Sequence, residues 1–149
     1  MTSDIIASAC LSIWKELEAS GKLKFIKDPL YTIMAGIALI HGDEVQCVAI
    51  GSGSKCLAQS QLSSLNGDCL HDSHAEILAR RGMIVWLLSE MQKMKADHSY
   101  RSRWLENRNQ DTTGVKFKLR EGVMVHMYVS SLPCAPFLQS RWARCAMND

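Results

Sequence analysis

The sequence predicts an α/β domain, a layered sheet with helices packed on it. Three observations lead to this class: an amphipathic pattern over residues 3–19, two neighbouring runs rich in Ile and Val, and a long apolar pattern over residues 73–95 that a further strand follows. An order of helix, strand, strand, helix and strand is typical of helices that cover a sheet. The 149 residues are enough for one domain with its own core.

The first helix is predicted over residues 3–19, because apolar side chains recur there at helical spacing and Gly21 follows as a stop signal. Its apolar face comprises Ile5, Ile6, Cys10, Ile13, Trp14 and Leu17. The runs at residues 32–40 and 45–50 predict a hairpin, although the connection through Gly42-Asp43 and its flanking residues is not of the tightest kind.

The segment Gly51-Ser52-Gly53-Ser54-Lys55 predicts a tight turn in which the backbone can approach another group closely. It is not a phosphate-binding P-loop, because the spacing to the lysine is wrong. Taken alone it is equally well an ordinary turn.

The helix predicted over residues 73–95 is apolar on most sides, so we expect it to be central and well covered. Residues 97–114 are polar and predict a long loop. A strand is expected at 123–130, ended by Pro133, and a short helix at 137–146.

Composition limits the class of protein more than its activity. The formal net charge is +2, with five Lys/Arg against seven Asp/Glu in residues 1–70 and twelve against eight in residues 71–149. The basic second half fits a polyanionic partner, or simply a solvated charged surface. No run of 18 apolar residues and no secretion signal is present, so we expect an intracellular protein of the nucleus and/or cytoplasm. Its six cysteines are then expected to be reduced thiols, mostly small core residues, and some of them metal ligands.

One constellation of residue types points to chemistry. His74 and Glu76 stand two residues apart where the long helix is predicted to begin, and Pro133-Cys134 follows the last predicted strand. Imidazole and thiolate are zinc ligands, and a carboxylate beside the metal can move protons. Nucleobase deaminases combine a His-x-Glu with a Pro-Cys in this way. The alternative for the first segment is a capping box, in which Ser73 and Glu76 satisfy the helix start and His74 has no special role.

Four segments occur in the order found in a known family. They are Gly51-Ser52-Gly53-Ser54-Lys55-Cys56, residues 72–81 (DSHAEILARR), Phe117-Lys118-Leu119-Arg120 and Tyr128-Val129-Ser130-Ser131-Leu132-Pro133-Cys134. Together they resemble the A-to-I editase family and, within it, the tRNA-specific adenosine deaminases. The resemblance extends from about residue 3 to Cys134. It implies a deaminase-like layered sheet and zinc-dependent hydrolytic deamination of adenosine to inosine in tRNA.

The resemblance also implies roles for individual residues. Glu76 corresponds to the catalytic proton shuttle, and His74 and Cys134 correspond to zinc ligands. The pair Arg80 and Arg81 matches basic residues that hold a buried inositol hexakisphosphate in the family; without the family they read as charges on a helix surface. Ser54 and Lys55 match a loop near the target nucleotide of the RNA. The implied partner is tRNA, with neither a membrane nor DNA expected.

The sequence departs from the family after Cys134. The family continues with Gly-Asp-Ala and a distant third cysteine ligand, whereas Ala135-Pro136-Phe137 follows here. We therefore expect residues 1–134 to be the N-terminal part of the deaminase domain, with an incomplete C-terminal half, and 135–149 to be a divergent tail. Cys145 is a poor substitute ligand, since a helical path from Cys134 would be about 16 Å long. His126 is more readily explained as an ordinary strand histidine.

Three readings of the function follow. The first is an active tRNA adenosine deaminase, which we expect to be impaired in this chain because the third ligand is missing. The second is an inactive RNA-binding or non-productive member of the same family. The third, a small-nucleoside deaminase, requires a Cys-x-x-Cys after Pro133, and Cys134-Ala135-Pro136-Phe137 does not supply one.

Overall fold

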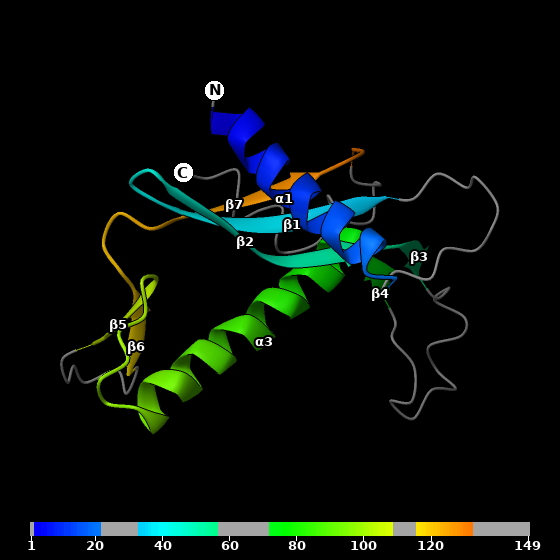
Figure 1. The fold of residues 1–149 in the computed structure, drawn as a ribbon. Coiled ribbons are helices and arrows are strands. Elements are labelled where there is room, and N and C mark those ends of the chain that lie inside the picture. The colour runs from blue at the N-terminus through cyan, green and yellow to red at the C-terminus, as the bar shows by residue number, and fades with distance from the viewer. Residues whose placement is uncertain (1, 22–32, 57–71, 109–115, 133–149) are drawn as a thin grey trace, which may run out of the picture.

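A computed structural model of the chain describes residues 2–21, 33–56, 72–108 and 116–132 (Figure 1). It confirms the predicted α/β class. The elements, in chain order, are α1 Thr2–Ala19, β1 Met34–His41, β2 Glu44–Ser52, β3 Ser54–Cys56, β4 Asp72–His74, α3 Ala75–Ala96, β5 Leu105–Asn107, β6 Phe117–Leu119 and β7 Met124–Val129. The short helix predicted at residues 137–146 lies outside the described residues.

The main sheet has three antiparallel strands in the order β2-β1-β7. The predicted hairpin is confirmed and is tighter than expected, because His41 pairs directly with Glu44. Only Gly42 and Asp43 remain in the turn, and Gly42 has a φ of +60°, which the first position of a type II′ turn requires. The central strand β1 is buried along almost its whole length, which explains its continuous apolar sequence.

The two long helices cover opposite faces of this sheet (Figure 1). On one face, Ile6 and Cys10 of α1 pack with alternate β1 residues; that cluster comprises Ile6, Cys10, Met34, Ala38 and Ile40. On the other face, Ala75 and Ala79 of α3 pack against Ala35, Ile37 and Ala49. Because successive strand residues point to opposite sides, β1 supplies both cores with alternate side chains.

Helix α3 is less covered than its composition predicted. Ile84, Val85 and Leu88 are exposed, with 38%, 67% and 57% of their surfaces accessible. The expectation of a well-covered helix is therefore wrong for the part of the chain that the structure describes. The sheet packs against α3 on one side, and the C-terminal half of the helix extends past its edge (Figure 1).

The loop predicted over residues 97–114 contains more structure than expected. Strand β5 pairs with β6. Trp104, just before β5, and Leu105, its first residue, are both buried. The Trp104 indole donates a hydrogen bond to Gln46 of β2 at 2.8 Å, which ties the segment to the main sheet. The polar composition of the segment does not predict this contact, because two apolar residues among many polar ones give no periodic pattern. The strand predicted at 123–130 is confirmed as β7.

Candidate active site

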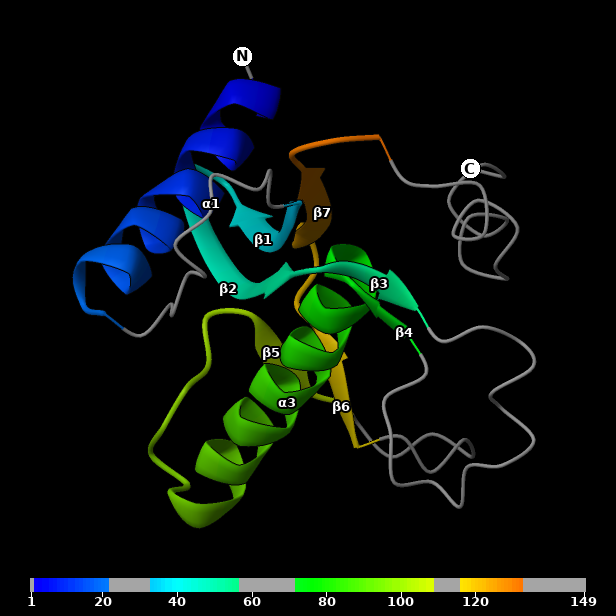
Figure 2. The same cartoon turned by 90° about the vertical axis from the view of Figure 1, so that its right-hand side faces the viewer.

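Two short strands position the residues around His74. Strand β3 pairs antiparallel with β4, so that Ser54 lies opposite His74 and Lys55 opposite Ser73. The predicted turn at residues 51–55 is thus a brief break at Gly53, after which the chain enters β3 (Figure 2). The segment matched to an RNA-contacting loop and the segment matched to a zinc ligand are therefore neighbours in the structure.

The long helix begins at Ala75, two residues later than the sequence predicted. His74 occupies the N-cap position with extended backbone, and its side chain makes no capping hydrogen bond. Ser73 belongs to β4 instead of the helix. The alternative of a capping box formed by Ser73 and Glu76 is therefore wrong, because Ser73 is not at the position that a box requires.

Two glycines let β2 approach the start of α3. A Cβ atom on Gly51 would overlap the Ala75 carbonyl oxygen and come within 2.5 Å of the Ala79 nitrogen. At Gly53, with a φ of +153°, a Cβ would overlap the Ser73 carbonyl oxygen. The Gly53 carbonyl instead accepts a hydrogen bond from the Ala75 N–H at 2.9 Å. The glycine pair, which the sequence flagged for close backbone approach, therefore fixes where β4 ends and α3 begins.

Asp72 orients the His74 ring. Its Oδ1 accepts hydrogen bonds from the His74 Nδ1 at 2.8 Å and from the His74 backbone N–H at 2.9 Å. A carboxylate accepts only, so Nδ1 carries the proton, and in the neutral ring the lone pair is on Nε2. Histidines that bind metals are commonly held by a carboxylate in this manner. Sequence reasoning gave Asp72 no role; its place two residues before a histidine was the available signal.

Glu76 lies in the first turn of α3 and is only 3% exposed. Its Oε2 is buried and has no hydrogen-bond partner among the described residues. Buried polar atoms are usually paired, so an unpaired one is a candidate for binding or catalysis. The N-terminus of a helix favours negative charge at this position.

The residues at this end of α3 fit part of a metal site. His74 presents a ring fixed by a carboxylate, and Glu76 is a buried neighbour that can act without being a ligand. Cys134 lies outside the described residues, as does Pro133, so its position relative to His74 is not defined. Within the described segments no group of three His, Cys, Asp or Glu side chains is arranged to hold an ion.

The arginine pair follows on the next turn of α3. Arg80 and Arg81 are both half-buried, in contrast to the freely solvated helix charges that the sequence alone suggested. Arg81 Nη1 donates to the backbone carbonyl of Asp72 at 3.1 Å, linking it to the strand that carries His74. Ser54 of β3 is exposed.

His126 lies away from this site. It pairs with Ala38, whose side chain faces α1, and it lines a cavity of about 480 Å³ together with residues of the first turns of α1. His74 is at the start of α3, on the opposite side of the sheet. His126 is thus a strand histidine on the other face of the sheet, and its buried Nε2 has no hydrogen-bond partner among the described residues.

Comparison with known proteins identifies the family. The sequence model of the adenosine-deaminase (editase) domain matches residues 49–136. The tRNA-specific adenosine deaminase 1 of Saccharomyces cerevisiae is 35% identical over 108 residues, 70% of this chain and 26% of that protein. The protein of the same description from Drosophila melanogaster is 33% identical over 131 residues, 87% of this chain and 29% of that protein.

A double-stranded RNA-specific adenosine deaminase of Rattus norvegicus is 36% identical over 87 residues, 58% of this chain and 7% of that protein. The chain thus spans between a quarter and a third of the length of the two tRNA-specific relatives. None of the helices in the described segments is long and apolar enough to cross a membrane. The matched domain covers more than half of the sequence and includes the whole β4–α3 site, so the chain belongs to the adenosine-deaminase (editase) family.

Proposed function

We propose that this chain contributes to the hydrolytic deamination of adenosine to inosine in tRNA. The observation that carries the proposal is that a carboxylate-oriented His74 and a buried Glu76, whose Oε2 has no hydrogen-bond partner among the described residues, lie together at the start of α3. A nucleobase deaminase needs a metal-binding histidine and a nearby carboxylate on one side of its reaction centre. The chain belongs to an editase family, so these two residues are the candidates for those roles.

Zinc is the metal that suits these residues. His74 through its Nε2 and Cys134 through its thiolate would hold the ion, with Asp72 keeping the ring in place. Bound there, zinc would lower the pKa of a water molecule so that hydroxide is available near neutral pH. Residues 135–149 differ from the family's continuation, so impaired activity of this chain is part of the proposal.

Glu76 is the proposed proton carrier. Its carboxylate accepts the proton of the water that attacks C6 of the adenine ring. The same group returns protons to the ring nitrogen and to the departing amine, so that adenosine and water give inosine and ammonia. Burial keeps competing water away from the Glu76 carboxylate.

The proposed substrate is tRNA, not a long RNA duplex. The tRNA-specific relatives match 70%, 87% and 88% of this chain, whereas the double-stranded RNA-specific relatives match 58% to 68%. Ser54 and Lys55, on the strand beside His74, are proposed to contact the RNA near the target nucleotide. The proposed domain is residues 1–134, with residues 135–149 as a divergent tail, and the proposed location is the nucleus and/or cytoplasm.

Inositol hexakisphosphate is the proposed ligand of the arginine pair. Arg80 and Arg81 are half-buried, and guanidinium groups bind phosphate through paired donors. Inositol hexakisphosphate should raise the melting temperature of the chain, and Arg80→Gln should reduce that rise. Lys95→Gln, at the far end of the same helix, is the matched control. A rise of equal size in both variants would contradict the assignment.

The function is tested by incubating the purified chain, loaded with zinc, with tRNA and measuring inosine. Glu76→Gln should keep its zinc and lose at least 100-fold in rate, in line with the usual contribution of a positioned general base. His74→Ala should lose both zinc and activity. Glu44→Gln, an exposed residue of β2, should change neither.

Two outcomes would overturn this function. Failure of the folded chain to retain zinc under metal-replete conditions would remove the proposed chemistry. Retained zinc and tRNA binding with no inosine at any enzyme concentration would instead support an inactive RNA-binding member of the family.

A further inference from the structure

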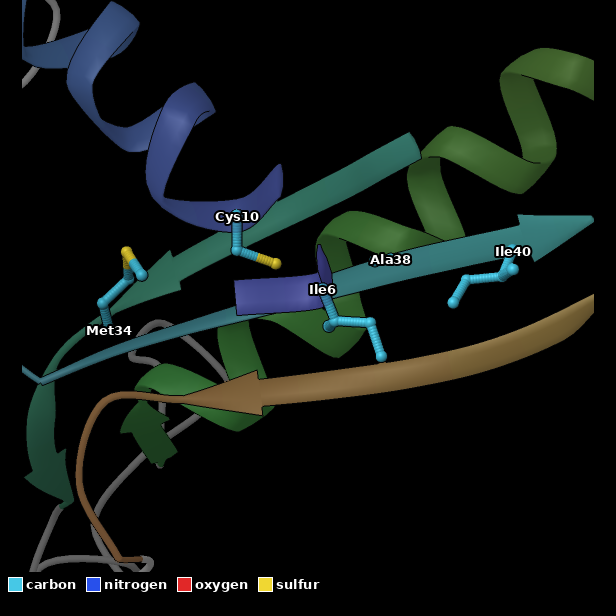
Figure 3. Close-up of a cluster of buried hydrophobic side chains, with 5 residues drawn as sticks. All are labelled: Ile6, Cys10, Met34, Ala38 and Ile40. Atoms are coloured by element: carbon cyan, nitrogen blue, oxygen red, sulfur yellow. The ribbon is translucent and has the colours of Figure 1, made fainter. Parts of the chain in front are cut away.

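Two cysteine thiols meet between α1 and the sheet, on the face opposite the His74 site. Cys10 has no exposed surface and belongs to the apolar cluster beneath α1. Cys47 of β2 is partly buried and packs against the same cluster. Figure 3 shows Cys10 projecting from α1 toward β1. The proposed deamination uses neither thiol.

Small residues on β1 bring the helix close enough for this contact. Gly36 lies directly beneath Cys10, since a Cβ there would be 2.5 Å from the Cys10 sulfur. Ala38, two residues further along the same face, is the register partner of Cys47. Side chains larger than these would lift α1 away from β2. The small residues of β1 therefore allow α1 to lie close enough to the sheet for these two thiols to be near each other.

Both thiols pack in the same apolar cluster, and the Cys47 Sγ donates a hydrogen bond to the Ala49 carbonyl at 3.6 Å. Interaction with the Cys10 side chain lowers the pKa of the Cys47 thiol. The same interaction, together with burial, raises the pKa of Cys10. β2 is at one edge of the three-stranded sheet, and Cys47 retains some exposed surface, so a small reagent can reach it. Cys47 is thus the more nucleophilic thiol and Cys10 its sheltered neighbour.

We propose that Cys10 and Cys47 form a peroxide-sensitive dithiol that closes to a disulfide between α1 and β2. The Cys47 thiolate attacks one oxygen of hydrogen peroxide, the O–O bond breaks, and a sulfenic acid and hydroxide form; the hydroxide takes up the proton that Cys47 released on ionising and becomes water. The Cys10 sulfur then attacks the Cys47 sulfur and displaces the hydroxyl group, which leaves as water with the Cys10 proton. The two thiols together give up the pair of electrons that the peroxide takes.

Peptide mapping tests the disulfide directly. The folded chain is treated with hydrogen peroxide, its remaining thiols are alkylated, and it is digested with trypsin without reduction. Cys10 falls in the peptide of residues 1–15 and Cys47 in that of residues 28–55, each as the only cysteine. Cys56 falls in a separate peptide, residues 56–80. The expected product is 1–15 linked to 28–55, absent before oxidation and removed by a reductant.

Variants separate the roles of the two thiols. In Cys10→Ala, Cys47 loses the interaction that lowers its pKa and should react more slowly with peroxide, but the sulfenic acid that forms should persist and be trapped by dimedone, because no neighbouring thiol removes it. In Cys47→Ala, Cys10 should stay a thiol at the peroxide concentration that oxidises the native pair. Circular dichroism checks that both variants fold, and mapping of the unaltered chain decides the question if either does not.

Three results would overturn the proposal. One is the absence of the linked peptide from the oxidised, folded chain. Another is a link between residues 1–15 and 56–80 that forms as readily, since the fold would then not select the partner. The last is equally fast oxidation of Cys10 in Cys47→Ala. Repeating the reaction in urea should abolish the preference for the Cys10–Cys47 link, because that preference depends on the packing of α1 on β2.

Discussion

At the scale of single residues, the site depends on residues whose role is to position other residues. Asp72 fixes the proton of the His74 ring on Nδ1, so the opposite nitrogen is the one able to bind a metal. Gly51 keeps the end of β2 against the first turn of α3, where Glu76 is buried. Neither residue would enter the proposed chemistry, yet the geometry around His74 depends on both.

Asp72→Asn tests the orienting role. The amide still accepts the backbone hydrogen bond of His74 but lacks the charge that holds the proton on Nδ1, so zinc affinity should fall by roughly 10- to 100-fold. Zinc content and competition with a chelator measure this. Asp97→Asn is the matched control, because Asp97 accepts similar hydrogen bonds from Ser99 at the other end of α3. Equal zinc affinity in the two variants would contradict the role of Asp72.

Gly51→Ala tests the close approach of β2 to α3. The added methyl group would overlap backbone atoms of Ala75 and Ala79, so we expect a loss of about 1–3 kcal/mol in the free energy of unfolding. Gly82→Ala is the control on the helix side of the same interface, because its methyl would meet the Ala49 Cβ at 3.1 Å and no backbone atom closer than the Ala49 Cα at 4.0 Å. Urea denaturation compares them, and Gly51→Ala should be clearly the less stable variant.

At the scale of elements, a buried glutamate ties the end of α3 to the segment that follows. Glu90 accepts hydrogen bonds from Lys93 at 2.8 Å and from Tyr100 and Ser102 at 2.9 Å each. Burial by itself would raise the pKa of Glu90, but these hydrogen bonds and the charge of Lys93 outweigh it and lower the pKa. The segment entering β5 is thereby held against α3, although its sequence predicts a loop.

Glu90→Gln should destabilise the chain by about 1.5–3 kcal/mol, the usual contribution of hydrogen bonds to a charged group. Because the pKa is lowered in the folded state, the contribution of Glu90 is present above the ordinary glutamate pKa and is lost as pH falls through the native value. Unfolding measured against pH should show that acid-side loss in the native chain and a smaller one in Glu90→Gln.

Glu106→Gln provides the comparison for Glu90. Glu106 pairs with Lys118 across the β5–β6 ladder, on a more exposed surface. Exposed ion pairs contribute little to stability, so this variant should unfold almost as the native chain does. A larger loss at Glu106 than at Glu90 would show that the buried network is not what holds this segment.

At the scale of the whole molecule, apolar surface remains uncovered. In the described segments β7 pairs with β1 along one edge only, and its Met124, Val125 and Met127 are exposed. Ile84, Val85 and Leu88 of α3 add a second exposed apolar group. An open strand edge and contiguous apolar surface both favour association.

The isolated chain should therefore self-associate as its concentration rises, which light scattering after size-exclusion chromatography measures. Replacing Met124 and Met127 together by lysine should reduce association without lowering the melting temperature, since both side chains are already exposed. Leu119→Lys, at an exposed position on β6, should not have this effect. A monomer at all concentrations with one sharp, cooperative melt would count against this expectation.

Periodicity was a reliable guide where an element is long. The helix over residues 3–19, the hairpin of β1 and β2, and β7 all follow from it, and the structure confirms them. Periodicity failed where a segment is ordered by a few contacts with residues far away in the sequence. Trp104 reaches Gln46 on another strand, and a polar segment thereby becomes an ordered one. The start of α3 was misplaced for a related reason, because pairing with β3 overrides the capping preference of Ser73.

By itself the sequence determined the α/β class and the family, because apolar periodicity and the motifs around His74 and Pro133-Cys134 are local features of the chain. Only the tertiary structure decided which side chains serve one another. Packing places Asp72 against the His74 ring, buries Glu76 with its Oε2 unpaired among the described residues, and sets Cys47 against the cluster that contains Cys10. These pairings depend on how α1, β3 and α3 pack against their neighbours, and spacing along a chain does not encode the distance across a packed interface.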